Sequence, residues 1–257
     1  MVIDMEIVLI VSLFILGSIL ASFFTLVGMR VPLGEPIDGR SVCDHCGVKL
    51  PCYALIPILG FFLVKGRCHN CRYKVSFRYP VYEALGGLLF ALGYLYLQEN
   101  VVEYLVTVVF VMLLLTVAVS DIEYQVVPDK VLIAFAPVVL VLRLLFPLST
   151  VGMSIAGGVA AFLFMWALAA YGRYRFKRDA LGGGDIKLYG LIGIFLGLEL
   201  VFLSLFFAAL VALFPGRLVL RKVNPIPFVP FIFVGVVLAY LFGPMVIDWY
   251  VETLFIM

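Results

Sequence analysis

The sequence is poor in charged residues. Only 13% of its 257 residues are Asp, Glu, Lys or Arg, whereas 65% are hydrophobic and the mean hydropathy is +1.18. Soluble globular domains carry about twice this share of charged residues. The composition therefore excludes an ordinary soluble domain and indicates an integral membrane protein.

The chain also lacks fixed-period repeats, low-complexity tracts and the basic N-terminus of a secretory signal peptide. Asp4 and Glu6 stand where such a peptide has Lys or Arg, and no small-residue cleavage site follows the first apolar run. We therefore expect this run to be retained as a membrane-spanning helix.

The hydrophobic runs predict an all-α polytopic membrane protein with about eight transmembrane helices. We place them at residues 7–28, 80–97, 103–120, 131–147, 150–170, 186–198, 200–215 and 228–247. Several of these segments are close to the lower length limit for crossing a bilayer.

The basic residues alternate with acidic ones along the chain. They follow the first, fifth and seventh segments, as Arg30, Arg40, Lys49, Lys65, Arg67, Arg72, Lys74, Arg78, Arg173, Arg175, Lys177, Arg178, Arg217, Arg221 and Lys222. Arg143 is the one basic residue near the opposite ends, which are acidic. By the positive-inside rule the basic loops are cytoplasmic and both termini face outwards.

Four cysteines in the first basic loop form two C-x2-C pairs. The pairs are Cys43 with Cys46 and Cys68 with Cys71. Two such pairs supply the four thiolates of a closed, tetrahedral structural zinc site. A cytoplasmic location disfavours disulfides, because that compartment keeps thiols reduced. We therefore expect structural zinc, with iron or disulfides as the alternatives.

Other residues of this loop have simpler interpretations. His45 and His69 lie inside the two pairs and are expected to be loop residues or hydrogen-bond donors to the site, although either could replace a failed cysteine ligand. Cys52 has no partner at ligand spacing and is interpreted as a small buried hydrophobe. The basic character follows from the orientation in the membrane, so we expect no nucleic-acid binding.

Three regions are thus expected. Residues 1–28 form the first transmembrane helix, residues 29–79 a cytoplasmic four-cysteine zinc domain, and residues 80–257 a seven-helix membrane core.

Two aspartates mark the ends of hydrophobic segments. Asp121 follows the third segment, and Asp185 follows three glycines at the start of the sixth. A carboxylate at a membrane span is costly, so each is a candidate functional residue, against the simpler interpretation of a solvated helix end. The topology places both on the cytoplasmic side, where they could share a proton and activate water.

The helix dipoles predict different roles for the two carboxylates. Asp121 ends a helix and is expected to be the protonated partner, whereas Asp185 begins one and is expected to be the ionised base. Asp129 is a rival that more simply caps the next helix. Glu83, near the start of the second segment, is either a helix-start carboxylate or a ligand contact. The prolines of the 225–230 run exclude an ordinary helix there.

Most of the chain, residues 15–235, resembles the type IV prepilin peptidases, membrane aspartic proteases of the GxGD class. The shared motifs are Gly17-Ser18, Arg30-Val31-Pro32, both cysteine pairs, Leu55-Ile56-Pro57, Lys65-Gly66-Arg67-Cys68, Arg78-Tyr79-Pro80 with Glu83, Asp121 with Val127-Pro128-Asp129, Gly182-Gly183-Gly184-Asp185-Ile186-Lys187 and Pro227-Phe228-Val229-Pro230-Phe231. One departure is Thr25, where many members have Asn.

The resemblance implies a bifunctional enzyme of the bacterial inner membrane. It implies cleavage of the basic leader of prepilins and pseudopilins at the cytoplasmic face by Asp121 and Asp185, and zinc on the four paired cysteines. It also implies N-methylation of the new N-terminus with S-adenosylmethionine. No glycine-rich nucleotide loop is visible, so the methyl-donor residues are unassigned.

Two other functional classes compete with this interpretation. A polytopic transporter could use Asp121 and Asp185 as a cation site and the cysteines as a metal sensor, but transporters of this size usually show repeats and helices broken inside the membrane. A non-catalytic scaffold presenting a zinc ribbon leaves the glycine-rich Asp185 motif unexplained.

Overall fold

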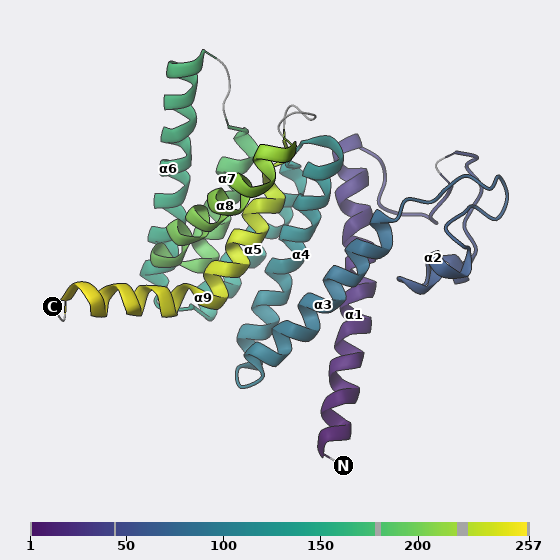
Figure 1. The fold of residues 1–257 in the computed structure, drawn as a ribbon, viewed down its shortest axis with the longest axis horizontal. Helices are drawn as coiled ribbons and strands as arrows, with labels where there is room; N and C mark the ends of the chain where they lie inside the picture. The colour runs from purple at the N-terminus through teal and green to yellow at the C-terminus, as the bar shows by residue number, and fades with distance from the viewer. Residues whose placement is uncertain (1, 44, 178–180, 220–225, 256–257) are drawn as a thin grey trace. The chain divides into compact units, whose positions relative to one another are not determined.

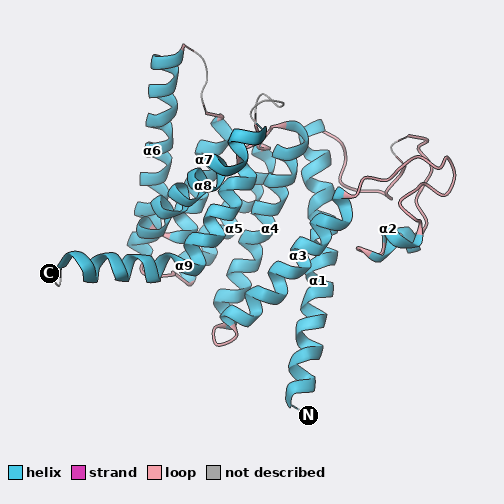
Figure 2. Ribbon diagram, viewed as in Figure 1, coloured by secondary structure: helices cyan, strands magenta, loops and turns pink. Residues whose placement is uncertain are grey.

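The computed structural model describes residues 2–43, 45–177, 181–219 and 226–255. Within them the protein is helical and has no β-strand, only two isolated bridges between Val42 and Lys49 and between Arg67 and Lys74 (Figures 1 and 2). The helices are α1 (Val2–Arg30), α2 (Leu59–Leu63), α3 (Arg78–Leu97), α4 (Val101–Tyr124), α5 (Asp129–Leu145), α6 (Val151–Phe176), α7 (Gly183–Leu196), α8 (Leu198–Val219) and α9 (Val229–Phe255). The all-α expectation is confirmed.

Eight long helices occupy the eight expected segments, but only five of those described are long and apolar enough to cross a bilayer, namely α1, α3, α4, α6 and α9. The expected count of about eight spans is therefore not exact. Helices α5 and α7 have 17 and 14 residues, fewer than the roughly 20 that a crossing needs. The side chains of α7 are mostly buried, and such short segments are tolerated at membrane depth where protein surrounds them.

The contacts divide the chain into two compact units, residues 1–119 and 120–257. Helix α4 begins in the first unit, and its last turn belongs to the second. The expected division at residues 28 and 79 concerns function and membrane sidedness, so it stays a prediction.

The first unit is built on the pair α1 and α3. A Cβ atom on Gly17 would stand 2.8 Å from the carbonyl oxygen of Gly86 and 2.7 Å from the ring of Phe90. Only glycine at position 17 therefore lets the two backbones approach this closely, as small residues do at membrane helix interfaces. This packing accounts for Gly17 in the first motif of the sequence.

Glu83 joins three segments of the first unit. On α3, its Oε1 accepts a hydrogen bond from the Ser22 hydroxyl of α1 at 2.7 Å, and its Oε2 accepts one from the backbone N–H of Ile58 at 2.6 Å. Ile58 has φ +63°, a costly value for a β-branched residue. The Glu83 carboxylate therefore holds the 56–58 turn of the cysteine-bearing loop. This role differs from both interpretations of Glu83 that the sequence left open, a helix-start carboxylate and a ligand contact.

The second unit contains α5–α9 and the last turn of α4. A Cβ atom on Gly193 of α7 would collide with the Gly157 backbone of α6, so these helices touch through glycines. Helices α8 and α9 also pack against each other.

Candidate active site and candidate metal centre

Asp121 lies in the last turn of α4, because the helix continues to Tyr124. Its side chain is 7% exposed, and its Oδ2 accepts a hydrogen bond of 2.8 Å from the backbone N–H of Val229. The turn that follows is held by the Ser120 hydroxyl, which donates to the carbonyl oxygen of Val126 at 2.6 Å. The buried carboxylate thus has a fixed position.

The Val229 N–H was not anticipated from the sequence. Residues 226–228 are non-helical, as the prolines required, and α9 begins at Val229. Pro230 is inside the first turn of α9, where no intrahelical N–H bond is needed, so the expected exclusion of helix was wrong for residues 229–230. Pro225 lies outside the described residues. Pro227 and Pro230 have no backbone N–H. Phe228 and Val229, which lie between them, are therefore the two residues of this stretch whose backbone N–H can donate.

Asp185 lies in the first turn of α7, whose N-cap is Gly182. The three glycines before it differ in their surroundings. A Cβ atom on Gly184 would collide with Val127 in the loop after α4, whereas one on Gly183 would meet nothing within 4 Å. Gly184 thus lets the Asp185 turn pack against the loop that follows Asp121. The space beside Gly183 is empty, so another polypeptide segment has room there.

The two aspartates are close enough to interact electrostatically. Asp185 precedes the expected span 186–198 and lies outside the five spans. Burial, reinforced by the negative charge of Asp121, raises the pKa of Asp185 to about 6. Asp185 is thus within electrostatic range of Asp121, the residue with which the sequence analysis paired it.

The local hydrogen bonds favour the reverse of the expected protonation roles. An N–H donor stabilises an ionised carboxylate, and Asp121 has one from Val229. The Asp185 carboxyl, with its raised pKa, is better suited to hold the shared proton. The Asp185 carboxyl also has a backbone hydrogen bond, at Gly182, which opposes the effect of burial on its pKa, and a coupled pair titrates as a unit.

Asp129 does not cap α5, so that expectation was wrong. The N-cap is Pro128, and Asp129 is the first helical residue. Both of its carboxylate oxygens lie 2.8 Å from Nζ of Lys187 on α7. This exposed ion pair joins the start of α5 to the turn that carries Asp185. Sequence reasoning missed it because the partners are 58 residues apart.

The four paired cysteines meet in the first unit, and Cys52 is not among them. All four sulfurs lie within 4.8 Å of one another, with Cys43 Sγ 3.7 Å from Cys71 Sγ and Cys46 Sγ 4.0 Å from Cys68 Sγ. Sulfurs bound tetrahedrally to one zinc ion at about 2.3 Å stand about 3.8 Å apart. The spacing fits one metal ion such as zinc, and all the cysteines are free of disulfides.

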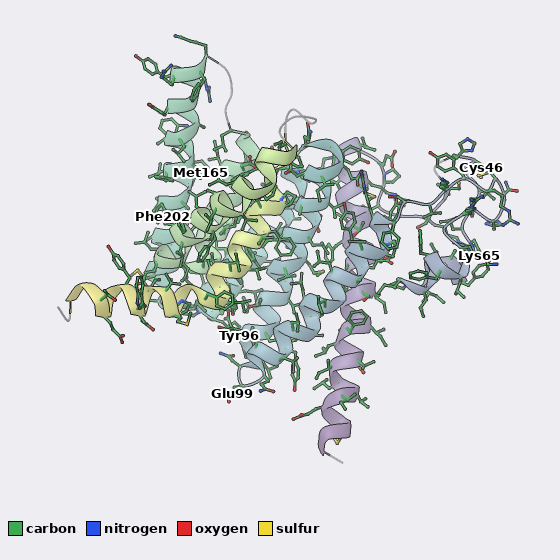
Figure 3. All side chains as sticks on the ribbon, in the orientation of Figure 1. Cys46, Lys65, Tyr96, Glu99, Met165 and Phe202 are labelled. Carbon is green, nitrogen blue, oxygen red and sulfur yellow. The ribbon has the colours of Figure 1, made fainter. Side chains whose placement is uncertain are left out.

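Backbone donors favour the thiolate form of Cys46 and Cys68. A hydrogen bond from the Val48 backbone lowers the pKa of the Cys46 thiol to about 7. A metal binds the thiolate form, so this environment suits a ligand. Cys46 and Lys65 both lie in the loop-rich segment that carries the cluster (Figure 3).

Among the described residues of the loop, His45 and Cys52 are not in the metal cluster. The His45 ring stacks on Tyr73 with centroids 4.8 Å apart, which links the two cysteine pairs. Cys52 Sγ is exposed and lies 3.7 Å from Nη2 of Arg40, so its interpretation as a buried hydrophobe was wrong.

Comparison with known proteins identifies related sequences along most of the chain. Residues 15–98 match the bacterial peptidase A24 N-terminal domain, and residues 108–216 match the type IV leader peptidase family. A prepilin leader peptidase/N-methyltransferase of Bacillus subtilis (strain 168) is 38% identical over 93% of this chain and 97% of its own length. A prepilin leader peptidase/N-methyltransferase of Vibrio cholerae is 30% identical over 92% of this chain and 98% of its own length.

No solved structure matches the chain. The relatives nevertheless cover both units almost completely. The descriptions of the two matching families agree with the names of these relatives. Five apolar helices of spanning length and this ancestry indicate a multi-pass protein of the bacterial inner membrane. The chain belongs to the type IV leader peptidase family.

Proposed function

We propose that this protein is a membrane aspartic endopeptidase that removes the leader of prepilins and pseudopilins. The observation that supports the proposal is that Asp121 and Asp185, two carboxylates from different helices, lie within electrostatic range of each other. The names of its relatives supply the substrate class, prepilins. The open space at Gly183 offers room for an extended substrate backbone beside Asp185.

The chemistry follows from a pair that holds one proton. Asp121, ionised and oriented by the Val229 N–H, takes a proton from water as the oxygen of that water adds to the scissile carbonyl carbon. Asp185 donates its proton to the carbonyl oxygen. The tetrahedral intermediate then collapses: its hydroxyl proton returns to Asp185, the C–N bond breaks, and the proton on Asp121 passes to the leaving amine.

The active site is assigned to the cytoplasmic face. Arg173 and Arg175 lie in the last turn of α6, and residues 177–182 connect that turn to the turn of Asp185. The positive-inside rule assigns such basic ends to the cytoplasm. Arg178, Arg221 and Lys222, which contributed to the same expectation, lie outside the described residues.

A second activity is proposed from the relatives alone. Their shared name includes N-methyltransferase, and the corresponding reaction here would methylate the new N-terminal residue with S-adenosylmethionine. We assign no residue to the methyl donor. Residues 29–79 are proposed as a cytoplasmic domain in which Cys43, Cys46, Cys68 and Cys71 hold a structural zinc ion. Residues 80–257 are proposed as the peptidase core.

One experiment tests both activities. A pilin precursor is incubated with the purified, reconstituted protein, with and without S-adenosylmethionine, and its mass is measured. We expect the precursor to lose its leader in both samples. The mature pilin should gain about 14 Da, the mass of one CH₂ group, only when the methyl donor is present. An intact precursor in both samples would contradict the peptidase, and cleavage without mass gain would contradict the methyltransferase alone.

A further inference from the structure

An uncharged stretch interrupts the basic loop between α1 and α3. Residues 50–64, which read LPCYALIPILGFFLV, contain no Asp, Glu, Lys or Arg, whereas Lys49 and Lys65 stand directly at the two ends. Apolar stretches of about 10–14 residues are too short to cross a bilayer and are often interfacial or re-entrant. This stretch is of that length class, so its composition suits contact with lipid without a crossing.

The structure folds the stretch into a short hairpin. A 3-10 helix, η2 (Cys52–Leu55), is followed by α2 (Leu59–Leu63). The two helices meet at Gly60, where a Cβ atom would collide with the carbonyl oxygen of Ala54. We call this segment, residues 52–64, the 52–64 hairpin.

The hairpin presents apolar side chains on its outer surface. Leu59, Phe62 and Leu63 of α2 are 58–60% exposed, and Leu55 and Ile56 are also exposed. A group of exposed large apolar side chains marks a surface that contacts a partner or a membrane.

Hydrogen bonds set the depth of the hairpin beside two spans. The Ile58 N–H, directly before α2, donates to Glu83 of α3, and Glu83 accepts from Ser22 of α1. Helix α3 has 20 residues and measures about 30 Å, the thickness of the hydrocarbon core, so its whole length is needed to cross. Glu83 lies five residues, about 7.5 Å, after Arg78 at the start of α3. The Ile58 turn is therefore below the end of this span.

The other end of α2 lies at the start of the same span. The Phe61 ring contacts the Phe77 ring edge-on at 5.5 Å, and Phe77 is the N-cap of α3. Helix α2 thus rises from the level of Glu83 to the beginning of α3, and Lys65 follows. Figure 1 shows α2 beside the first half of α3 and below the C-terminal end of α1.

The backbone of the deepest part has its donors satisfied. The Ile58 N–H has the carboxylate described above, the Leu59 N–H donates to the Pro57 carbonyl oxygen at 2.6 Å, and the Gly60 N–H donates to that of Ile56 at 2.7 Å. Backbone at membrane depth needs such partners, because no water is available there.

We propose that the 52–64 hairpin is inserted in one leaflet of the bilayer, with the exposed side chains of α2 in lipid, and that it favours phospholipids with anionic headgroups. The depth of the Ile58 turn beside two spans makes lipid the occupant of the apolar surface. Lys49 and Lys65, both exposed, stand at the ends of the stretch, where basic side chains attract anionic headgroups. The cytoplasmic leaflet follows from the proposed topology, whereas the insertion does not depend on it.

The insertion has a consequence for the cysteine cluster. The hairpin lies in the chain between Cys46 and Cys68, which belong to different cysteine pairs. One metal ion on both pairs closes the base of the segment whose tip is in lipid. The cluster is thereby held at the membrane surface beside the start of α3.

Tryptophan quenching tests the insertion. The two native tryptophans, Trp166 and Trp249, are replaced by Phe, and a single tryptophan is introduced as Phe62→Trp or, in the matched control, as Tyr73→Trp. Tyr73 is similarly exposed, 54% against 59% for Phe62, but its ring stacks on His45 beside the cysteine cluster. The full-length, zinc-loaded proteins are placed in nanodiscs of phosphatidylcholine and phosphatidylglycerol.

We expect lipids brominated in the upper part of the acyl chain to quench Phe62→Trp several-fold more than Tyr73→Trp. Aqueous iodide should show the reverse order. Leu63→Trp is a second probe of the same surface and should behave as Phe62→Trp does, and the zinc content of each variant checks its folding.

Two outcomes would overturn the insertion. Iodide quenching of Phe62→Trp and Leu63→Trp as strong as that of the control would mean that the hairpin lies in water. Quenching of both probes by neither reagent would mean that protein covers the surface, either residues 120–257 of the same chain or a second copy.

The headgroup preference has its own test. With equal amounts of the two lipids present, brominated phosphatidylglycerol should quench Phe62→Trp more than brominated phosphatidylcholine does. Lys49→Gln with Lys65→Gln should abolish this difference and leave the insertion. Equal quenching by the two lipids in the protein that retains both lysines would contradict the preference for anionic headgroups.

Discussion

At the scale of single residues, the two glycines before Asp185 make different demands. A Cβ at 184 collides with Val127, whereas one at 183 has open space. We expect Gly184→Ala to cost about 1–3 kcal/mol in stability and to displace Asp185, with a loss of activity of about 100-fold. The Gly183→Ala protein should have the same unfolding temperature as the wild-type protein. Thermal unfolding and peptidase rates of the two variants, side by side, check this.

The outcome that contradicts this packing is a Gly184→Ala protein that is as stable and active as wild type. An effect of Gly183→Ala on KM with unchanged stability would agree with the proposed approach of substrate at that position.

Glu83 makes a prediction of the same kind in the first unit. Glu83→Ala removes the acceptor of the Ile58 N–H, and an unsatisfied donor costs about 1–3 kcal/mol. The Ile58 amide should therefore exchange hydrogen faster in this variant. Ser22→Ala is the matched control, because it removes one contact of Glu83 and leaves the Ile58 bond. Equal exchange in wild type and Glu83→Ala would show that the turn does not depend on the carboxylate.

At the scale of elements, the cysteine cluster is expected to fold around its metal. Replacement of Cys43, Cys46, Cys68 or Cys71 by Ser should abolish binding of one zinc ion per chain, whereas Cys52→Ser should retain it. Part of the folding free energy of the 29–79 segment should be lost with the metal. Elemental analysis and limited proteolysis of the variants measure both effects. Zinc-free wild-type protein, or loss of zinc on changing Cys52 alone, would contradict the assignment.

The elements also show what could be predicted from sequence. Hydrophobic length located all eight long helices, because this feature depends on neighbouring residues. Asp121 and Asp185 could be paired because the predicted topology sends both segment ends to one side. The number of spans was not exact, because a buried and largely apolar helix such as α7 can be too short to cross.

Contacts between distant positions could not be derived in this way. The N–H of Val229 reaches Asp121 across 108 positions of sequence, and no local pattern records a backbone donor. The Asp129–Lys187 pair likewise depends on how α5 and α7 pack. The Val229 contact led us to propose the reversed protonation roles, and the Lys187 contact replaces the expected role of Asp129, while the proposed pair of aspartates is unchanged.

At the scale of the whole molecule, the site must meet a substrate that is itself partly in the membrane. A prepilin has a basic leader followed by a hydrophobic helix. Photo-crosslinkers near its cleavage site should capture residues close to Asp121 and to Gly182–Gly184, with the substrate helix against neighbouring spans. Mass spectrometry of the crosslinked peptides gives the positions. Capture confined to the loops around Glu99 or Ser149 would contradict the proposed sidedness and mechanism.

The most direct test of the account compares three aspartate variants in the precursor mass assay. The mechanism needs one ionised and one protonated carboxyl group. Asp121→Asn and Asp185→Asn each replace one of these groups by an amide, so each should lower the cleavage rate by about 1,000-fold or more. Both proteins should still insert in the membrane and bind zinc. Asp129→Asn, which alters an exposed ion pair, should retain substantial activity. An active Asp121→Asn or Asp185→Asn, together with an inactive Asp129→Asn, would contradict the assignment of the catalytic pair.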